Sequence, residues 1–140
     1  MIKFKQEFLD DVFDIEKNSF DNHWSKPMLL ECANNDAAIF KVLVEKEKTV
    51  GFYIVTTACT EAELLKIAID KTFRNSGFAK KALLNIEKES IYKKCDKIFL
   101  EVSKSNSAAL NLYLASGFET INIRKNYYGT QDALIMRKFL

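Results

Sequence analysis

A strand, an amphipathic helix and a second strand follow one another in the middle of the chain, and this order constrains the fold more than any other feature. Residues 63–69 (ELLKIAI) and 98–102 (IFLEV) are short apolar runs typical of buried strands. Between them, residues 77–94 place Ala82, Leu83 and Ile86 at helical spacing. Because strands joined by such a crossover run parallel, with a right-handed connection, we predict a parallel pair inside the sheet.

The flanking segments predict further elements of one layered α/β (α+β) architecture with a single central sheet. Upstream, we expect a short strand at residues 1–4, helices at 6–18 and from Ser25 to about residue 34, and hairpin strands at 37–44 and 49–60. Downstream, we expect a helix at 106–116 that ends at Gly117, followed by strands at 118–124 and 133–139. The sequence contains no linker or internal repeat, so we predict one domain over residues 1–140.

The composition argues against several classes of function. The chain has 21 Lys and Arg against 19 Asp and Glu, so a strongly nucleic-acid-binding surface is not expected. Its four glycines form neither a Gly-x-Gly-x-x-Gly motif nor a Walker A loop. Cys32, Cys59 and Cys95 are far apart and His23 is the only histidine, which predicts neither a disulfide framework nor a metal site. Uncharged stretches stay below the ~17 residues of a membrane helix. We therefore expect a cytoplasmic protein that does not bind membranes.

A glycine-containing loop precedes the central helix and has the chemistry of a phosphate site. A helix N-terminus presents unpaired N–H groups and the positive end of the helix dipole, both of which favour phosphate. Gly77 and the small Ala79 allow a close approach, and Arg74 can add a charge-assisted hydrogen bond. Many strand-to-helix loops contain a glycine for structural reasons alone, so the loop by itself leaves both interpretations open.

Three polar residues in and after the next strand also have two interpretations each. Glu101 stands between Leu100 and Val102, so its side chain lies either on a solvated sheet face or at a cleft. Asn106 is a preferred N-cap residue for the following helix. Tyr113 falls on the apolar face of that helix, where a core tyrosine would fit equally well.

In their order and spacing, these segments resemble the GCN5-related N-acetyltransferases (GNAT), and within them the ribosomal-protein-alanine N-acetyltransferases of the RimI type. The matching strings are ELLKIAID, RNSGFAKKALL, LEVSKSNSAALNLYLASGF, RKNYY and DALIM. The family pattern Gln/Arg-x-x-Gly-x-Gly/Ala is met by Arg74, Gly77 and Ala79, and NSFDNHWS extends a weaker similarity to the N-terminus. The resemblance implies a mixed, mostly antiparallel sheet with a splayed parallel strand pair, flanked by about four helices.

The resemblance implies transfer of an acetyl group from acetyl-coenzyme A to an amine, without a metal. Glu101 matches the family's general base and Tyr113 its general acid. The pantetheine arm would lie along the strand that carries residues 67–69, and the pyrophosphate on the loop of residues 75–80 beside Arg74. The positions expected to contact acetyl-coenzyme A are Ile67, Ala68, Ile69, Arg74, Asn75, Ser76, Gly77, Phe78, Ala79, Lys80 and Asn106.

The acceptor side is less well defined by the resemblance. Tyr127 and Tyr128 match residues that line the family's peptide cleft, although an aromatic pair on a sheet face would give the same pattern. Ser103 replaces an arginine that is frequent in the family, and the loop after Tyr128 is short and lacks proline. Three functions are therefore considered. The first is a protein N-terminal acetyltransferase, with the N-terminal alanine of a ribosomal protein as the family substrate. The others are an acetyltransferase of small-molecule amines or lysines, and a non-catalytic module that binds acyl-coenzyme A.

Overall fold

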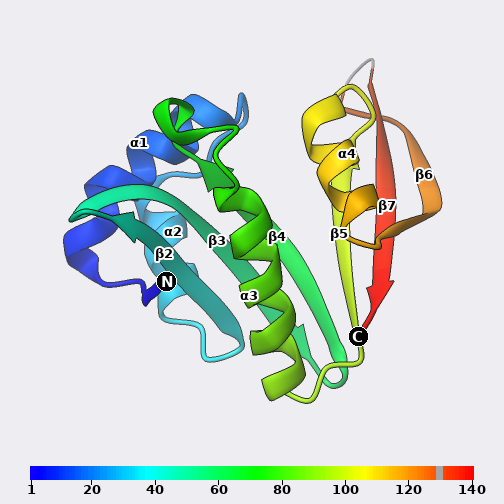
Figure 1. Ribbon diagram of the computed structural model, residues 1–140, viewed down its shortest axis with the longest axis horizontal. Helices are drawn as coiled ribbons and strands as arrows, with labels where there is room; N and C mark the ends of the chain where they lie inside the picture. Colours follow the sequence, from blue (N-terminus) through cyan, green and yellow to red (C-terminus); the bar gives the residue numbers. More distant parts are fainter. Residues whose placement is uncertain (129–130) are drawn as a thin grey trace.

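A seven-stranded sheet forms the centre of the computed structural model, which describes residues 1–128 and 131–140 and, for residues 127 and 128, only the backbone. Its strand order is β1-β2-β3-β4-β5-β7-β6 (Figure 1). All neighbouring strands are antiparallel except β4 and β5, which confirms the predicted mixed sheet and its parallel pair. The strands are β1 (Ile2–Lys3), β2 (Ala38–Glu45), β3 (Lys48–Ala58), β4 (Glu61–Ile69), β5 (Lys97–Ser103), β6 (Glu119–Tyr128) and β7 (Gln131–Phe139).

Within the described residues, four α-helices cover the two faces of this sheet. They are α1 (Leu9–Ser19), α2 (Lys26–Ala33), α3 (Phe78–Tyr92) and α4 (Ser107–Ala115), with short 3-10 turns at Gln6–Phe8 and Lys71–Phe73. In Figure 1, α3 and α4 lie in front of the strands, whereas α2 lies behind them. No helix in this part of the chain is long and apolar enough to cross a membrane.

The alternation of side chains along the strands supplies a separate core for each face. One core packs α1 and α2 against β2, β3 and β4, and its buried residues include Val12, Leu29, Phe40, Phe52 and Ile54. The other core packs α3 and the Tyr113 ring of α4 against β2, β3, β4, β5 and β7, and its buried residues include Leu64, Leu83, Ile86, Ile98, Leu100 and Met136. The strands β2, β3 and β4 contribute buried residues to both cores.

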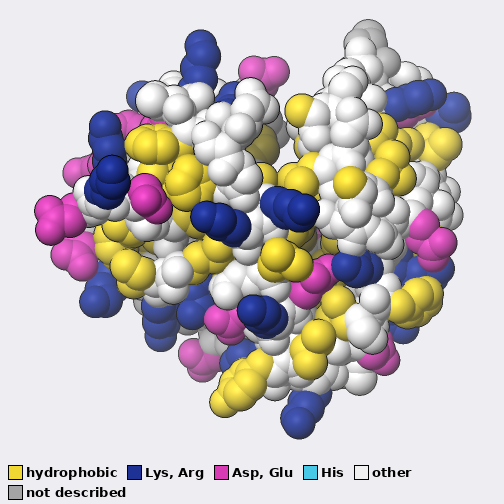
Figure 2. Space-filling model, in the orientation of Figure 1, with side chains coloured by type: hydrophobic (Ala, Val, Ile, Leu, Met, Phe, Trp, Pro, Cys, Tyr) yellow, Lys and Arg dark blue, Asp and Glu magenta, His cyan; other side chains and the backbone are white. Residues whose placement is uncertain are grey.

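A β-bulge ends the pairing of β4 with β5 halfway along these strands. Parallel pairing runs from Glu61 opposite Lys97 to Leu64 opposite Leu100. On the other side of β4, Val55 pairs with Leu64 and Ile54 with Lys66, so Leu65 is the extra residue of the bulge. Because a bulge bends its strand and increases the local twist, β4 turns away from β5 beyond this point. The two strands diverge in Figure 1, and Figure 2 shows a notch in the molecular surface above them. The predicted splay is thus confirmed.

The last hairpin differs from its prediction, because β6 continues past residue 124 to Tyr128 and joins β7 at Gln131. The register shifts between Arg124 and Tyr128. Within this irregularity Asn126 has a φ of +54°, and its N–H donates to Asp132 Oδ1 at 3.0 Å. A hydrogen bond to a side chain across the hairpin therefore accompanies the extension of a strand that the local sequence had predicted to end as a loop.

Candidate active site

The free edge of β4 lines the gap that the bulge opens. From Leu65 to Ile69, β4 pairs with β3 only, so its other edge offers unpaired backbone groups to an extended ligand. The expected pantetheine positions lie here: Ala68 and Ile69 are buried and Ile67 is half-buried. This edge is suited to an amide-containing arm, because alternate N–H and C=O groups of a strand edge can pair with amides.

The first turn of α3 has the backbone geometry of an anion site. Asn75 and Gly77 have φ values of +61° and +84°, so both residues are in the left-handed region. Gly77 is the N-cap residue and provides no side-chain cap, and the first helical turn contains no acidic residue. A Cβ on Gly77 would have no atom within 4 Å, so the glycine is favoured here by backbone conformation rather than by space. Lys80 adds positive charge at this exposed end.

Arg74 holds this loop against the end of β4. Its Nε donates to the carbonyl of Ile69 at 2.9 Å, and its guanidinium donates to Ser19 Oγ at 3.3 Å. The side chain therefore joins α1, β4 and the loop. This anchoring role was not apparent from the sequence, whereas direct contact between Arg74 and a phosphate stays a prediction, as do the contacts of Ser76, Phe78 and Ala79.

Glu101 lies on the face of the sheet that carries α1 and α2. Its neighbours Leu100 and Val102 point into the opposite core, as alternation along β5 requires. Glu101 Oε1 forms an ion pair with the Arg124 guanidinium of β6 at 3.2 Å, and the Glu101 side chain is 26% exposed. The carboxylate is therefore partly accessible and has a cationic neighbour that the sequence pattern did not indicate.

Tyr113 lies on the other face of the sheet, in the core that packs α3 against the strands. Its side chain is only 6% exposed and packs edge-on against Phe118, with ring centroids 5.8 Å apart. Burial raises the pKa of Tyr113 to about 12, so the hydroxyl stays protonated at neutral pH. Among the described residues, no hydrogen bond to this hydroxyl is present, and it is not among the fully buried unpaired atoms. Tyr113 is thus an unengaged proton donor.

Asn106, a predicted coenzyme contact, has a structural role in addition to any functional one. Asn106 is the N-cap of α4, and its Oδ1 accepts a hydrogen bond from Ala109 N at 3.3 Å. The side chains of Tyr127 and Tyr128 lie outside the described residues. The acceptor-side hairpin that carries them is tied by Asp132, whose pKa is lowered chiefly by its hydrogen bond from the Asn126 backbone and further by Lys125.

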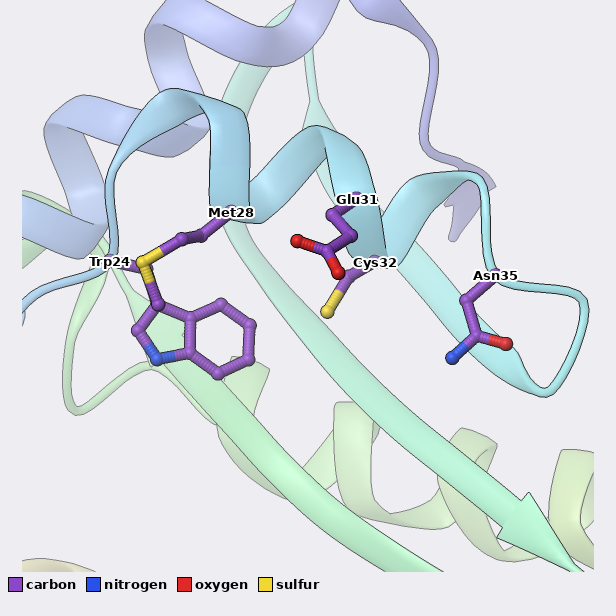
Figure 3. Close-up of a pocket in the computed structure, with 5 residues that line it drawn as sticks. All are labelled: Trp24, Met28, Glu31, Cys32 and Asn35. Atoms are coloured by element: carbon purple, nitrogen blue, oxygen red, sulfur yellow. The ribbon is translucent and has the colours of Figure 1, made fainter.

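A hollow also lies on the surface of α2. This pocket of about 320 Å³ is lined by Trp24, Met28, Glu31, Cys32 and Asn35. Figure 3 shows the Trp24 indole, the Glu31 carboxylate and the Cys32 thiol directed to the same side of the helix. Across residues 1–128 and 131–140, no group of three or more His, Cys, Asp or Glu side chains is arranged to hold a metal ion.

The comparison of the sequence with protein families agrees with this geometry. The site combines a bulged β4, a splayed parallel strand pair and an α3 N-terminus without a side-chain cap. Residues 9–118 match the model of the acetyltransferase (GNAT) family. The chain belongs to the GNAT acetyltransferase family. It is therefore an acetyl-coenzyme A-dependent N-acetyltransferase, which confirms the predicted enzyme class.

Curated GNAT relatives are similar over nearly the whole chain. A ribosomal protein bS18-alanine N-acetyltransferase from Haemophilus ducreyi is 36% identical over 136 residues, covering 92% of each chain. The enzyme of the same name from Escherichia coli is 30% identical over 129 residues, covering 89% of this chain and 86% of its own. These relatives confirm the predicted resemblance to the RimI-type branch of the family.

Solved structures give the same result for the fold. The crystal structure of the ribosomal-protein-alanine N-acetyltransferase of Escherichia coli superimposes with a TM-score of 0.90 at 27% identity. The alignment covers 98% of this chain and 90% of that one. The predicted GNAT-like fold is thus confirmed. The site geometry also fits acetyl-coenzyme A, since the free β4 edge suits its amide-containing arm and the α3 N-terminus suits its pyrophosphate.

Proposed function

We propose that this GNAT enzyme acetylates the N-terminal α-amine of a protein, and specifically an N-terminal alanine of ribosomal protein bS18. The observation that carries the proposal is the similarity over about nine-tenths of the chain to relatives named for that activity. A ribosomal acceptor would place the enzyme in the cytoplasm. The single seven-stranded sheet supports the further proposal that residues 1–140 act as one acetyltransferase domain.

The two faces of β5 suggest how the proton transfers are divided. Glu101 faces the side of α1 and α2, so we assign it to accept the amine's proton, directly or through a water. Tyr113 approaches from the side of α3, so we assign its hydroxyl to protonate the departing thiolate. In this scheme the amine nitrogen forms a bond to the acetyl carbon and the carbon–sulfur bond breaks. At the end of this step Glu101 carries the amine's proton and Tyr113 is a phenolate, so a proton must pass from Glu101 to solvent and from solvent to Tyr113 before the next cycle.

An α-amine is also an acceptor that a weak base can deprotonate. Only a neutral amine attacks a thioester, and α-amines have a pKa of about 7.7–8.0 against about 10.4 for lysine. Neutralising them at pH 7 therefore costs about 1.4 and 4.6 kcal/mol respectively. A carboxylate is a weak base, because a glutamate side chain has an ordinary pKa of about 4.3. A weak base therefore favours the α-amine over lysine.

Intact-mass spectrometry of two peptides tests the proposal. The first peptide begins with a free alanine, and the second is the same peptide with a blocked N-terminus and an internal lysine. We expect the gain of one acetyl group on the first peptide only. Acetylation of the blocked peptide, or consumption of acetyl-coenzyme A with small amines but neither peptide, would contradict the α-amine assignment. A peptide that begins with alanine followed by the relatives' acceptor sequence then tests the ribosomal substrate.

A further inference from the structure

A buried ion pair lies beneath the segment that joins α1 to α2. Glu16 of α1 is fully buried, and its Oε2 accepts hydrogen bonds from Lys66 Nζ and from the Trp24 backbone N–H, both at 2.8 Å. The Lys66 ammonium also lies 4.1 Å from the centroid of the Phe20 ring and 4.8 Å from that of Trp24. Glu16 Oε1 has no hydrogen-bond partner in the described part of the chain.

Burying both charges of this pair costs solvation free energy, which favours a role in positioning over a role in stability. Both charges lose solvation, because Glu16 is fully buried and the Lys66 side chain is only 11% exposed. Replacing a buried ion pair by apolar residues is often neutral or stabilising, so stability alone gives little reason to keep one. The pair does hold residues 20–25, which have no regular structure, at three points: the Trp24 backbone and the rings of Phe20 and Trp24.

The position of Lys66 connects the pair to the active site. Lys66 follows Leu65, the bulge residue at which β4 leaves β5, so its side chain lies where the gap begins. Lys66 contacts α1 and therefore lies on the same sheet face as Glu101. Phe20 and Trp24 pack over the Lys66 ammonium and therefore lie on the sheet face proposed for the acceptor amine, close to the point where the gap begins.

From this geometry we infer that Glu16 and Lys66 are positioning residues for the acceptor. Their ion pair fixes residues 20–25, and with them the Trp24 side chain, as a preformed wall beside the gap. A peptide acceptor then binds without first ordering this segment, which would otherwise reduce its affinity. The inference rests on the proposed function for the identity of the acceptor, but the fixing of the segment can be measured without any acceptor.

Trp24 is the only tryptophan of the chain, so its fluorescence reports on this segment alone. We expect Lys66→Met to increase acrylamide quenching of Trp24. With the alanine peptide, we expect this variant to raise the peptide KM about tenfold. Its kcat and its KM for acetyl-coenzyme A should stay within about twofold, because Lys66 moves no proton in the reaction. Lys66→Arg keeps the cation and should restore the parent peptide KM.

Two further variants separate positioning from folding. Lys66→Met leaves the Glu16 carboxylate buried without its partner, and this variant can fail to fold for that reason alone. The double variant Glu16→Leu with Lys66→Met removes both charges and is used for the same measurements if the single variant does not fold. Lys41→Met is the matched control, because Lys41 of β2 forms a 3.3 Å ion pair with Glu89 of α3 on the opposite sheet face. It should change neither Trp24 quenching nor the peptide KM.

The outcomes distinguish this inference from the proposed function. Parent-like quenching and peptide KM in the folded double variant would overturn the inference while leaving N-terminal acetylation intact. If the parent protein does not acetylate the peptide, the proposed function fails, and Trp24 quenching alone decides the inference. In that case, increased quenching in the double variant but not in Lys41→Met supports the fixed segment, and unchanged quenching contradicts it.

Discussion

At the scale of single residues, Tyr113 combines near-complete burial with a hydroxyl that no described residue engages. A buried tyrosine in a structural role usually forms a hydrogen bond, as Tyr53 does by accepting one from Asn85 Nδ2 at 2.6 Å. The Tyr113 hydroxyl, near the C-terminal end of α4, forms no such hydrogen bond with a described residue. The hydroxyl is therefore available to a substrate atom in the gap.

Replacing Tyr113 by phenylalanine should separate catalysis from binding. We expect the turnover number to fall about 10²- to 10⁴-fold, because the variant lacks the proposed proton donor for the thiolate. Binding of coenzyme A, measured by calorimetry, should stay close to that of the parent, since the packing of the ring is kept. Tyr53→Phe is the matched control, because it also removes a buried hydroxyl but lies outside the proposed site. Turnover of Tyr113→Phe within about twofold of the parent would refute the assigned role.

The individual site residues show what sequence can and cannot reveal. Glu101 and Tyr113 were predicted as catalytic residues from motif order, because their spacing within the chain resembles that of the family, and their roles stay a prediction. The Arg124 partner of Glu101 and the Lys66 partner of Glu16 were not predicted. Each pair joins residues more than twenty positions apart on different elements, so only the assembled fold shows that they meet.

At the scale of elements, the close approach of β3 to the free-edged half of β4 depends on Gly51. This residue pairs with Ile69, one of the positions proposed to bind the pantetheine arm. A Cβ on Gly51 would lie 2.6 Å from the Ala68 carbonyl oxygen and 2.8 Å from Ile69 Cδ1. The first of these atoms belongs to the backbone, so a side chain at residue 51 requires β4 itself to move.

Gly51→Ala should therefore lower the free energy of unfolding by about 1–3 kcal/mol, the usual cost of overpacking. It should also weaken coenzyme binding, because the displaced segment carries the free edge of β4. Urea denaturation with and without coenzyme A measures both effects. For Gly77→Ala we expect a smaller loss of stability, about 1 kcal/mol, because the added Cβ has open space and only the backbone conformation is disfavoured. A Gly51→Ala variant as stable as the parent would show that β4 adjusts without strain.

The elements themselves were largely predictable, because most follow from local periodicity. The strand–helix–strand order predicted the parallel pair, and apolar spacing predicted α3 and the β2–β3 hairpin. The bulge at Leu65 was not predicted, since ELLKIAI has the same pattern with or without an extra residue. The extension of β6 to Tyr128 was missed because it depends on the contact between Asn126 and Asp132.

At the scale of the whole molecule, two tyrosines buried in the same core, Tyr53 of β3 and Tyr113 of α4, make the stability depend on alkaline pH. Burial raises the pKa of Tyr113 to about 12, and burial, offset by the Asn85 hydrogen bond and reinforced by Glu89, raises the pKa of Tyr53 to about 12. An unfolded tyrosine has a pKa of about 10. Between these values the folded protein holds more protons than the unfolded chain, so stability falls as the pH rises.

We therefore expect the free energy of unfolding to be insensitive to these two tyrosines below about pH 10 and to decrease between about pH 10 and 12. Urea unfolding at a series of pH values measures the decrease in the parent and in Tyr113→Phe. The variant should show the shallower slope, and the lysines, which titrate in the same range, contribute equally to both proteins. Equal slopes would indicate that Tyr113 is not protected from ionisation by the fold.

The opposite placement of Glu101 and Tyr113 has a consequence for the order of events in a catalytic cycle. In the proposed scheme one group acts on each face of β5, so we expect the two substrates to enter from opposite faces, and neither then has to leave before the other arrives. Both products can likewise depart independently. Double-reciprocal plots of initial rates should consequently give intersecting lines, as expected when a complex of enzyme with both substrates forms before any product is released.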